Sequence, residues 1–497
     1  MNNYITLICI RSVVRIAAIL LCLIPTIIFA EFDDDTNSQS YANAELWTDA
    51  NALWITYSPI NQLPEYSGFG GSPSLQGNLA LIGASRQNQN GKSFVGNAFI
   101  YNIKTGEWLD LSKTPNSPIN QLPKGSGFGR SPSLQGNLAL IGASGNAFIY
   151  NIKTGEWLDL SKTPNSPINQ LPKGSGFGRS PSLQGNLALI AAPWQNQNGN
   201  SAVGNAFIYN IKTGEWLDLS KTPNSPINQL PKDSGFGGGT SLQGNLALIA
   251  ASGQDQNGKS NVGNAFIYNI KTGEWLDLSK TPNSPINQLS ATSHFGGGTS
   301  LQGNLALIGA SRQNQNGKYY VGNAFIYNIK TGEWLDLSKT PNSPINQLPE
   351  VSYFGNSTSL QGNLALIGAN SQNQNGKYYV GNAFIYNIKT GEWLDLSKTP
   401  NSPINQLPKG SGFGVGTSLQ GNLALIGASG QDQNGKHDVG NAFIYNIKTG
   451  EWLDLSIGNV SPRNSINLLE EESPTDTTPF FNPVVSQVFG ELPSWYL

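Results

Sequence analysis

The stretch Phe128-Gly129-Arg130-Ser131-Pro132-Ser133-Leu134-Gln135-Gly136-Asn137-Leu138-Ala139-Leu140-Ile141-Gly142-Ala143 recurs, with small changes, along most of this 497-residue chain. Its Phe-Gly head appears seven times, at Phe69, Phe128, Phe177, Phe236, Phe295, Phe354 and Phe413. Successive copies are 59 residues apart, except that 49 residues separate the second from the third. A fixed period of this size predicts a repeat architecture, so one repeat indicates the fold and the differences between repeats indicate the function.

One repeat contains four segments with the composition of β-strands. In the first repeat they are residues 71–76, 79–84, 97–102 and 107–111, bounded by the turns Gln76-Gly77-Asn78 and Lys104-Thr105-Gly106. Aromatic and β-branched residues between Gly, Asn and Pro are typical of strands, and no stretch of the repeat has a sustained helical period. The sequence therefore predicts an all-β fold.

Two features predict how the four strands pair. The second and third are apolar at consecutive positions, as expected where neighbouring sheets cover both faces. Pro73, Pro132 and Pro181 fall in the first strand of the first three repeats, and proline has no N–H to donate within a sheet. We therefore expect a four-stranded antiparallel blade whose first strand is an edge that faces a central channel.

Seven such units form either an open stack or a closed ring. An open stack needs polar capping repeats, but the first and last copies are as apolar as the middle ones. The sequence therefore predicts a seven-bladed β-propeller over residues 43–456, with repeats that start near 69, 128, 177, 236, 295, 354 and 413. Segment 43–58 resembles a spare fourth strand, and we expect it to pair with the last blade and close the ring. The fourth-strand tryptophans are expected to pack between blades: Trp108, Trp157, Trp216, Trp275, Trp334, Trp393 and Trp452.

The second repeat is shorter than the others, because Ser144 is followed directly by Gly145. It lacks the ten residues that occupy 86–95 in the first repeat, yet it keeps all four strand segments. The missing piece is therefore predicted to be a loop, in agreement with its Gln-Asn-Gln-Asn-Gly composition.

The first 30 residues have the pattern of a signal peptide. Arg11 and Arg15 precede an apolar run that ends at Ala30, and this run is too short to span a bilayer. Cleavage after Ala30 would give a secreted, periplasmic or cell-surface protein that does not span a membrane, and the alternative is an uncleaved segment that serves as a membrane anchor. Residues 31–42 are predicted to be an acidic linker, and residues 457–497 a C-terminal tail outside the repeats.

Composition excludes several classes of partner and site. Both cysteines, Cys9 and Cys22, lie in the predicted signal peptide, so the mature chain is expected to have no disulfide. Loss of Arg11 and Arg15 changes 29 basic against 31 acidic residues to 27 against 31, a net charge of −4, without a basic block. This balance argues against nucleic acid as a partner, and the mature chain is expected to be a monomer.

The repeat resembles a known family at its Phe-Gly head and Gly-Ala tail. Phe128-Gly129 followed by Gly142-Ala143 is similar to the FG-GAP repeat of integrin α-subunit propellers and of bacterial exported proteins, over residues 69–455. The Tyr101 and Trp108 pair is also similar to the kelch repeat, another propeller family. Integrin-type repeats carry an Asp-rich calcium loop between their first two strands, but the corresponding turn here is Leu-Gln-Gly-Asn. No calcium site and no cofactor are therefore expected.

Differences between the copies concentrate in two segments, the loop between the second and third strands and the connection to the next blade. In an up-and-down blade both emerge on one face of the ring. Aromatic, amide and glycine residues in these segments have the composition of adaptable recognition surfaces. The sequence therefore predicts that a protein or glycan ligand binds Tyr319, Tyr320, Tyr378, Tyr379, Trp194, His294, Tyr353 and His437.

The chain contains few residues of the types that catalysis needs. The chain has two histidines, in distant repeats, and only scattered carboxylates on the variable segments, whereas a glycoside hydrolase needs a carboxyl pair about 5 to 10 Å apart. The sequence therefore favours an exported, non-catalytic binding or cell-adhesion protein. Two alternatives stay open: an extracytoplasmic carbohydrate-active enzyme, either a hydrolase or a lyase, and a passive structural repeat protein.

Overall fold

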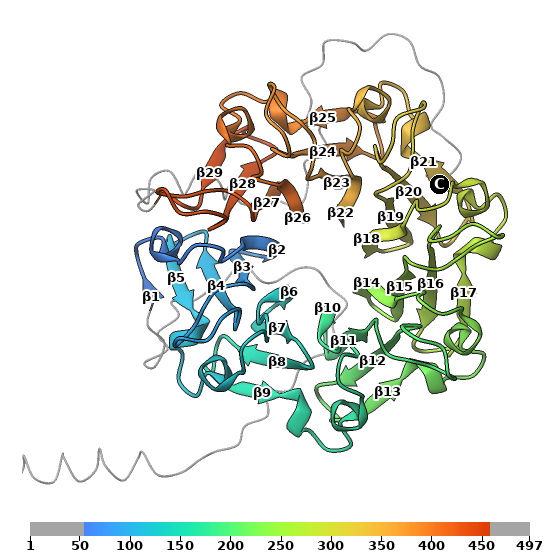
Figure 1. Ribbon diagram of the computed structural model, residues 1–497, viewed down its shortest axis with the longest axis horizontal. Helices are drawn as coiled ribbons and strands as arrows, with labels where there is room; N and C mark the ends of the chain where they lie inside the picture. The colour runs from blue at the N-terminus through green and yellow to red at the C-terminus, as the bar shows by residue number, and fades with distance from the viewer. Residues whose placement is uncertain (1–53, 458–497) are drawn as a thin grey trace, which may run out of the picture. The chain divides into compact units, whose positions relative to one another are not determined.

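The computed structural model describes residues 54–457. In this part of the chain every regular element is a β-strand or a short 3-10 helix, and the strands form seven antiparallel sheets in a ring (Figure 1). The chain is a seven-bladed β-propeller, which confirms the predicted all-β fold. The signal peptide predicted for 1–30, the linker for 31–42 and the tail beyond Ile457 lie outside the described residues.

Each blade contributes four strands in chain order. The first strands are β2 (Phe69–Gln76), β6 (Arg130–Gln135), β10 (Arg179–Gln184), β14 (Phe236–Gln243), β18 (Phe295–Gln302), β22 (Phe354–Gln361) and β26 (Phe413–Gln420). The second strands are β3 (Leu79–Ala84), β7 (Leu138–Ala143), β11 (Leu187–Ala192), β15 (Leu246–Ala251), β19 (Leu305–Ala310), β23 (Leu364–Ala369) and β27 (Leu423–Ala428). The third strands are β4 (Asn97–Asn102), β8 (Asn146–Asn151), β12 (Asn205–Asn210), β16 (Asn264–Asn269), β20 (Asn323–Asn328), β24 (Asn382–Asn387) and β28 (Asn441–Asn446). The fourth strands are β5 (Glu107–Asp110), β9 (Trp157–Asp159), β13 (Trp216–Asp218), β17 (Trp275–Asp277), β21 (Trp334–Asp336), β25 (Trp393–Asp395) and β29 (Trp452–Asp454).

Two short 3-10 helices follow the fourth strand in most connections between blades. The Leu-Ser-Lys helices are η2 (Leu111–Lys113), η4 (Leu160–Lys162), η6 (Leu219–Lys221), η8 (Leu278–Lys280), η10 (Leu337–Lys339) and η12 (Leu396–Lys398). The Pro-Ile-Asn-Gln helices are η1 (Pro59–Gln62), η3 (Pro118–Gln121), η5 (Pro167–Gln170), η7 (Pro226–Gln229), η9 (Pro285–Gln288), η11 (Pro344–Gln347) and η13 (Pro403–Gln406).

The predicted second and third strands of the first repeat agree with the structure at both ends. The first strand begins at Phe69 instead of residue 71, and its pairing with β3 is interrupted by a bulge between Phe69 and Pro73. The fourth ends at Asp110, because the Asp110 side chain accepts a hydrogen bond from the backbone N–H of Ser112 and caps η2. All residues of β3 and β4 are buried, as expected for strands covered on both faces.

The first strands line the centre of the ring (Figure 1), and hydrogen bonds to serine side chains join neighbouring ones. Ser74 Oγ accepts a hydrogen bond of 2.9 Å from the backbone N–H of Leu134 in the next blade. The same bond recurs at all seven blade junctions, including that between Ser418 in the last blade and Leu75 in the first. Pro73 lies in β2, which pairs only with β3 within its sheet, so the prolines occupy an edge strand as predicted.

The fourth-strand tryptophans pack between blades, as predicted. Trp275 lies against the apolar cluster that blades 3 and 4 share, and its Nε1 donates to Thr222 Oγ1 in the preceding connection at 3.0 Å. Buried indoles normally need such a partner for their N–H group. The bond recurs at Trp157, Trp216, Trp334, Trp393 and Trp452.

A buried polar group connects the third and fourth strands in each blade. Asn97 is fully buried, and its Nδ2 donates to Asp110 Oδ1 at 2.8 Å while its Oδ1 accepts from the backbone N–H of Ala98. Asp110 Oδ1 also accepts from Ser112. Because both partners are satisfied, this group adds specificity to the strand register without an unpaired buried charge.

For its described residues, the predicted strand pairing of segment 43–58 with the last blade is wrong, although Ser58 contacts that blade. Trp54–Ile55 (β1) pairs instead with β5, as a fifth strand on the first blade. The last blade already has its own fourth strand, β29. In the first blade, Ile55 pairs with Trp108 and packs on its cluster, and Trp108 is only 2% exposed.

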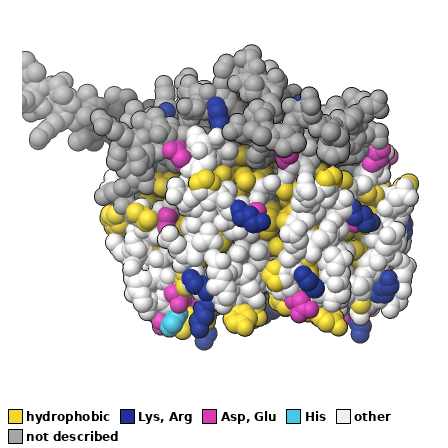
Figure 2. Space-filling view, turned by 90° about the horizontal axis from the view of Figure 1, so that it is seen from above, with side chains coloured by type: hydrophobic (Ala, Val, Ile, Leu, Met, Phe, Trp, Pro, Cys, Tyr) yellow, Lys and Arg dark blue, Asp and Glu magenta, His cyan; other side chains and the backbone are white. Residues whose placement is uncertain are grey.

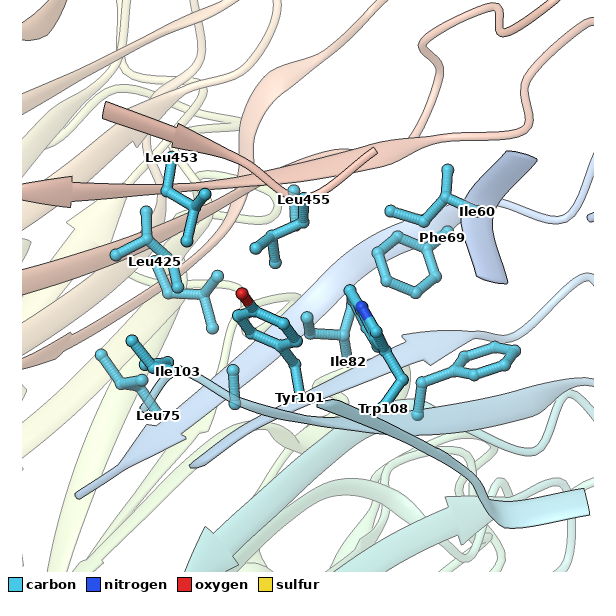
Figure 3. Packing of buried hydrophobic residues seen from close by; sticks show 14 of the residues in the cluster. Ile60, Phe69, Leu75, Ile82, Tyr101, Ile103, Trp108, Leu425, Leu453 and Leu455 are labelled. Carbon is cyan, nitrogen blue, oxygen red and sulfur yellow. The ribbon is translucent and has the colours of Figure 1, made fainter. Parts of the chain in front are cut away.

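Residues 58–63 close the ring by taking the place of the connection that would follow the last blade. Ser58 Oγ donates to the carbonyl of Leu455 at 2.7 Å, and Asn61 Nδ2 donates to the carbonyl of Ser456 at 2.8 Å. The second bond repeats one made within the other connections, such as Asn120 Nδ2 to the carbonyl of Ser112. Figure 3 shows side chains of both blades in one shared core, with Ile60, Phe69 and Trp108 on one side and Leu425, Leu453 and Leu455 on the other.

Replacement of the Phe-Gly glycine is expected to destabilise the ring. Gly129 has a φ of +93°, and an ideal Cβ there would lie 2.1 Å from the carbonyl oxygen of Asn97. We expect Gly129→Ala to reduce the free energy of unfolding by about 3 kcal/mol or more, measured by urea denaturation with tryptophan fluorescence. Gly136→Asn is the control, because Gly136 also has a positive φ but has no atom within 4 Å of the ideal Cβ. Equal costs for the two variants would contradict the proposed blade contact.

Candidate functional site

The variable segments lie together at one end of every blade. In the first blade Phe69 and Asn97 both pair with Ala84, so the loop between the second and third strands and the connection before Phe69 meet at this end. The Lys-Thr-Gly-Glu turns lie at the other end, where Asn102 pairs with Leu79. We call the first of these surfaces the variable face. It comprises the loops 85–96, 144–145, 193–204, 252–263, 311–322, 370–381 and 429–440 and the five residues before each Phe-Gly.

A repeated backbone frame holds this face. The backbone N–H groups of Val351, Tyr353 and Phe354 donate to the carbonyls of Tyr319, Tyr320 and Val321 at 2.9, 3.1 and 2.9 Å. The same three bonds occur in each blade with a full-length loop. The frame therefore fixes the chain path and leaves the outward side chains free to differ between repeats.

Four of the predicted site residues form one cluster with Arg312. The rings of Tyr319 and Tyr320 lie 6.5 Å apart, and Tyr320 is stacked on Tyr353 with centroids 6.1 Å apart. The guanidinium of Arg312 lies 6.0 Å from the Tyr353 ring centroid, and its Nη1 is 3.4 Å from His294 Nε2. Burial, and then repulsion from Arg312, lower the pKa of His294 below 6.5. The cluster spans the junctions on both sides of blade 5.

The remaining predicted residues lie elsewhere on the same face. Tyr378 and Tyr379, in the next blade, have ring centroids 6.5 Å apart, and Tyr378 is 67% exposed. His437 lies at the ring closure, 3.4 Å from an Asp432 carboxylate oxygen and 6.5 Å from the ring of Tyr66. The eight residues therefore share one face and form separate groups along it.

Trp194 forms a different arrangement in blade 3. The guanidinium of Arg179 lies 3.8 Å from the centroid of the Trp194 ring, a cation–π contact. Burial, and then repulsion from Arg130, lower the pKa of Arg179 to about 10. No carboxylate among the described residues lies within ion-pair distance of these two arginines.

The shortened loop of the second repeat opens a pocket beside Trp194. The pocket has a volume of about 300 Å³, at the lower end for ligand sites. Ile168 and Leu171, which border it, are partly buried, whereas their counterparts Ile227 and Leu230 are fully covered. The other lining residues are Ser144, Gly145, Pro172, Lys173, Gly174, Ser175, Gly176 and Phe177.

Figure 2 shows the propeller from the side. Both histidines belong to the variable face, and the histidine visible in the figure lies at the lower rim. Hydrophobic, basic and acidic side chains are present at that rim, and further hydrophobic and charged side chains lie on the side wall.

Sequence reasoning missed the pocket and the arginines. The sequence shows that repeat 2 lacks ten residues. It does not show that Ile168 becomes exposed as a result, because this depends on which residues the loop covers in the other repeats. Arg130 and Arg179 stand where other repeats have Gly71, Gly238 and Gly297, so comparison of the copies at the start of the first strand would have found them.

Comparison of the chain with protein-family models and with curated proteins finds no match. Within residues 54–457, no three or more His, Cys, Asp or Glu side chains are grouped so that they could hold a metal ion. The same residues contain no helix with the length and apolar character needed to cross a membrane.

The pocket predicts unequal costs for two equivalent core substitutions. Ile227 is 1% exposed and packs with Val203 and Leu230, so Ile227→Ala is expected to cost about 2 to 4 kcal/mol of unfolding free energy. Ile168→Ala removes the same atoms from the pocket wall and is expected to cost about 1 kcal/mol, because part of this surface is already exposed. Chemical denaturation of both variants measures the difference, and equal costs would show that the pocket is closed in solution.

The position of Arg312 predicts an abnormal titration of His294. The pKa of His294 in the folded chain is lowered, so the neutral imidazole is favoured by folding. This stabilisation is complete above pH 6.5 and decreases as the pH falls from 6.5 through the folded pKa. NMR titration in a His437→Asn background is expected to give a midpoint below 6.5, and Arg312→Gln is expected to raise it. A midpoint that does not respond to Arg312→Gln would contradict the contact.

Proposed function

We propose that this chain is an exported, non-catalytic binding or adhesion propeller that recognises a protein or glycan ligand through its variable face. The observation that carries the proposal is the distribution of exposed large apolar side chains. Eight are exposed in residues 54–457, and six of them belong to the variable face: Tyr66, Phe94, Trp194, Tyr319, Tyr378 and Tyr379. Grouped exposed aromatic residues are typical of binding surfaces, because each ring offers a rigid apolar area and, in tyrosine, a polar group.

Backbone conformation at two tyrosines supports the same proposal. Tyr320 and Tyr379 have φ values of 53° and 56°, a left-handed conformation that is unfavourable for bulky residues. The equivalent residue of repeat 4 is Asn261, which tolerates this conformation better. Aromatic residues at these positions therefore carry a conformational cost, as is common where a side chain serves binding.

The repeats are assigned to the FG-GAP type, with the kelch type as the nearest alternative. The positions that define the FG-GAP resemblance have a packing reason in this propeller, since an ideal Cβ on Gly83 would lie 1.9 Å from the carbonyl oxygen of Gly129. Export is inferred from the signal peptide expected in residues 1–30. A surface that acts outside the cell has to recognise molecules such as glycans and exposed proteins, which agrees with an aromatic and amide-rich face.

A variant made from the chain's own sequence tests the proposal. Tyr319→Ser, Tyr320→Asn, Tyr378→Ser and Tyr379→Asn together give repeats 5 and 6 the residues Ser260 and Asn261 of repeat 4, so the loop conformation is retained. Ligands are first identified with the mature chain on glycan arrays and by pull-down from extracellular protein mixtures. We expect the quadruple variant to bind the identified ligand at least tenfold more weakly, measured by surface plasmon resonance.

The control substitution is Tyr57→Ala, which removes an exposed tyrosine outside the variable face. It is expected to leave binding unchanged. The proposal fails if the quadruple variant binds as tightly as the wild type, or if the two variants lose affinity equally. Turnover of a glycan by the wild type, with no stable binding, would favour the enzyme alternative.

A further inference from the structure

The missing loop of repeat 2 exposes groups that the other six loops cover. In blade 1 the loop residues Ser93, Phe94 and Val95 accept hydrogen bonds of 2.9, 3.0 and 2.8 Å from three backbone N–H groups of the next connection. The loop runs parallel to that connection, as the bridge between Gly96 and Phe128 shows. Equivalent bonds are made by the loop residues 201–203, 260–262, 319–321, 378–380 and 437–439.

Side chains of the loop add two further contacts. The third residue is valine in all six loops, and Val203 is fully buried against Ile227 and Leu230 of the connection. A lysine precedes the three residues in five loops, and Lys92 Nζ donates to the carbonyl of Leu122 at 3.1 Å. The same lysine contact occurs at Lys259, Lys318, Lys377 and Lys436. Each loop therefore presents a Lys-x-x-Val segment, or Asn-x-x-Val in repeat 3, to one side of the next connection.

In repeat 2 the connection to the next blade is present, but the loop that would pair with it is absent. The groups equivalent to the three donors are the N–H groups of Gly174, Gly176 and Phe177, and none has a protein acceptor within residues 54–457. Gly176 and Phe177 are buried residues, so a donor left unpaired there is costly. The apolar surface that valine covers elsewhere is the wall formed by Ile168 and Leu171.

The hydroxyl of Ser175 is a second, independent sign of a ligand site in this pocket. Its six counterparts donate from Oγ to a carbonyl three residues earlier at 2.6–2.7 Å. Ser175 lines the pocket at 4% exposure, and its hydroxyl makes no such bond in the described part of the chain. Trp194 adds an aromatic wall and packs against Gly176.

We infer that this pocket binds an extended segment of a partner protein that carries a valine-like side chain and, three residues before it, a lysine. The segment would run parallel to residues 174–177, accept from the N–H groups of Gly174, Gly176 and Phe177, and insert its branched aliphatic side chain against Ile168. Its lysine would donate to the carbonyl of Leu171. Binding by added strand uses main-chain hydrogen bonds for affinity and a side-chain pocket for specificity. The inference rests on the proposed function and names a ligand class for one part of the variable face.

A peptide copied from the chain itself is the direct probe. The peptide Asn-Gly-Lys-Ser-Phe-Val-Gly-Asn, identical to residues 90–97, carries a fluorophore, and its binding to the full chain is followed by fluorescence anisotropy. We expect saturable binding, and we expect replacement of the peptide's valine by aspartate to weaken it at least tenfold. This comparison needs no protein variant, so it does not depend on the folding of one.

The matched protein variant restores the loop by insertion of the sequence of residues 86–95 between Ser144 and Gly145. It is expected to lose peptide binding and to retain the ligand of the tyrosine cluster, while the quadruple tyrosine variant is expected to show the opposite. Absence of saturable peptide binding up to about 1 mM, or equal binding to the loop-restored variant, would overturn the inference. Glycan binding that the restored loop abolishes, with no peptide binding, would also overturn it. The result with the quadruple variant is independent of each of these outcomes.

Discussion

The propeller depends on a close backbone contact between the Phe-Gly of one blade and the Gly-Ala of the blade before it. An ideal Cβ on Gly83 would lie 1.9 Å from the carbonyl oxygen of Gly129, and one on Gly129 would lie 2.1 Å from the carbonyl oxygen of Asn97. In two blades alanine replaces the first glycine, as at Ala191, but the Phe-Gly glycine is present in all seven. This contact sets the distance between blades at one end of the ring, so the phenylalanine and tryptophan side chains fill the space that remains.

Closure of the ring follows from the same contacts instead of from a shared sheet. The last blade has four strands of its own, and the first blade gains β1 as a fifth. Residues 58–63 supply the connection that would follow the last blade, so the two ends of the described residues 54–457 meet within a connection between blades. The seven Ser Oγ bonds around the channel are therefore unbroken at the closure. Backbone and side-chain groups both hold each junction between neighbouring blades. The outward side chains of the variable face can therefore differ between repeats.

The fold could be predicted from the sequence because the same pattern of four strands recurs in each of the seven repeats. The second and third strands were located to the residue, since tight turns and apolar runs bound them, whereas the start of the first was missed because Gly70 and its bulge do not look like a strand. Segment 43–58 resembles a spare fourth strand, and this similarity predicts the wrong strand pairing. At the site, sequence placed the variable residues on one face. It could not find the contact of Arg312 with His294 or the pocket at Ile168, because these depend on side-chain direction and on the contacts of a loop that repeat 2 lacks.

Residues 58–63 close the seven repeats into a ring, and the distance between two exposed positions at the closure measures this directly. Asn434 Nδ2 donates to Asn61 Oδ1 at 3.0 Å although the residues are 373 apart in sequence. Cysteines at these two positions, in a chain with Cys9 and Cys22 replaced by serine, accept spin labels for electron paramagnetic resonance. A closed ring gives a single distance at the short limit of the method within one molecule. A linear stack of seven sheets about 10 Å apart would separate the labels by about 60 Å, and such a distance would contradict the ring.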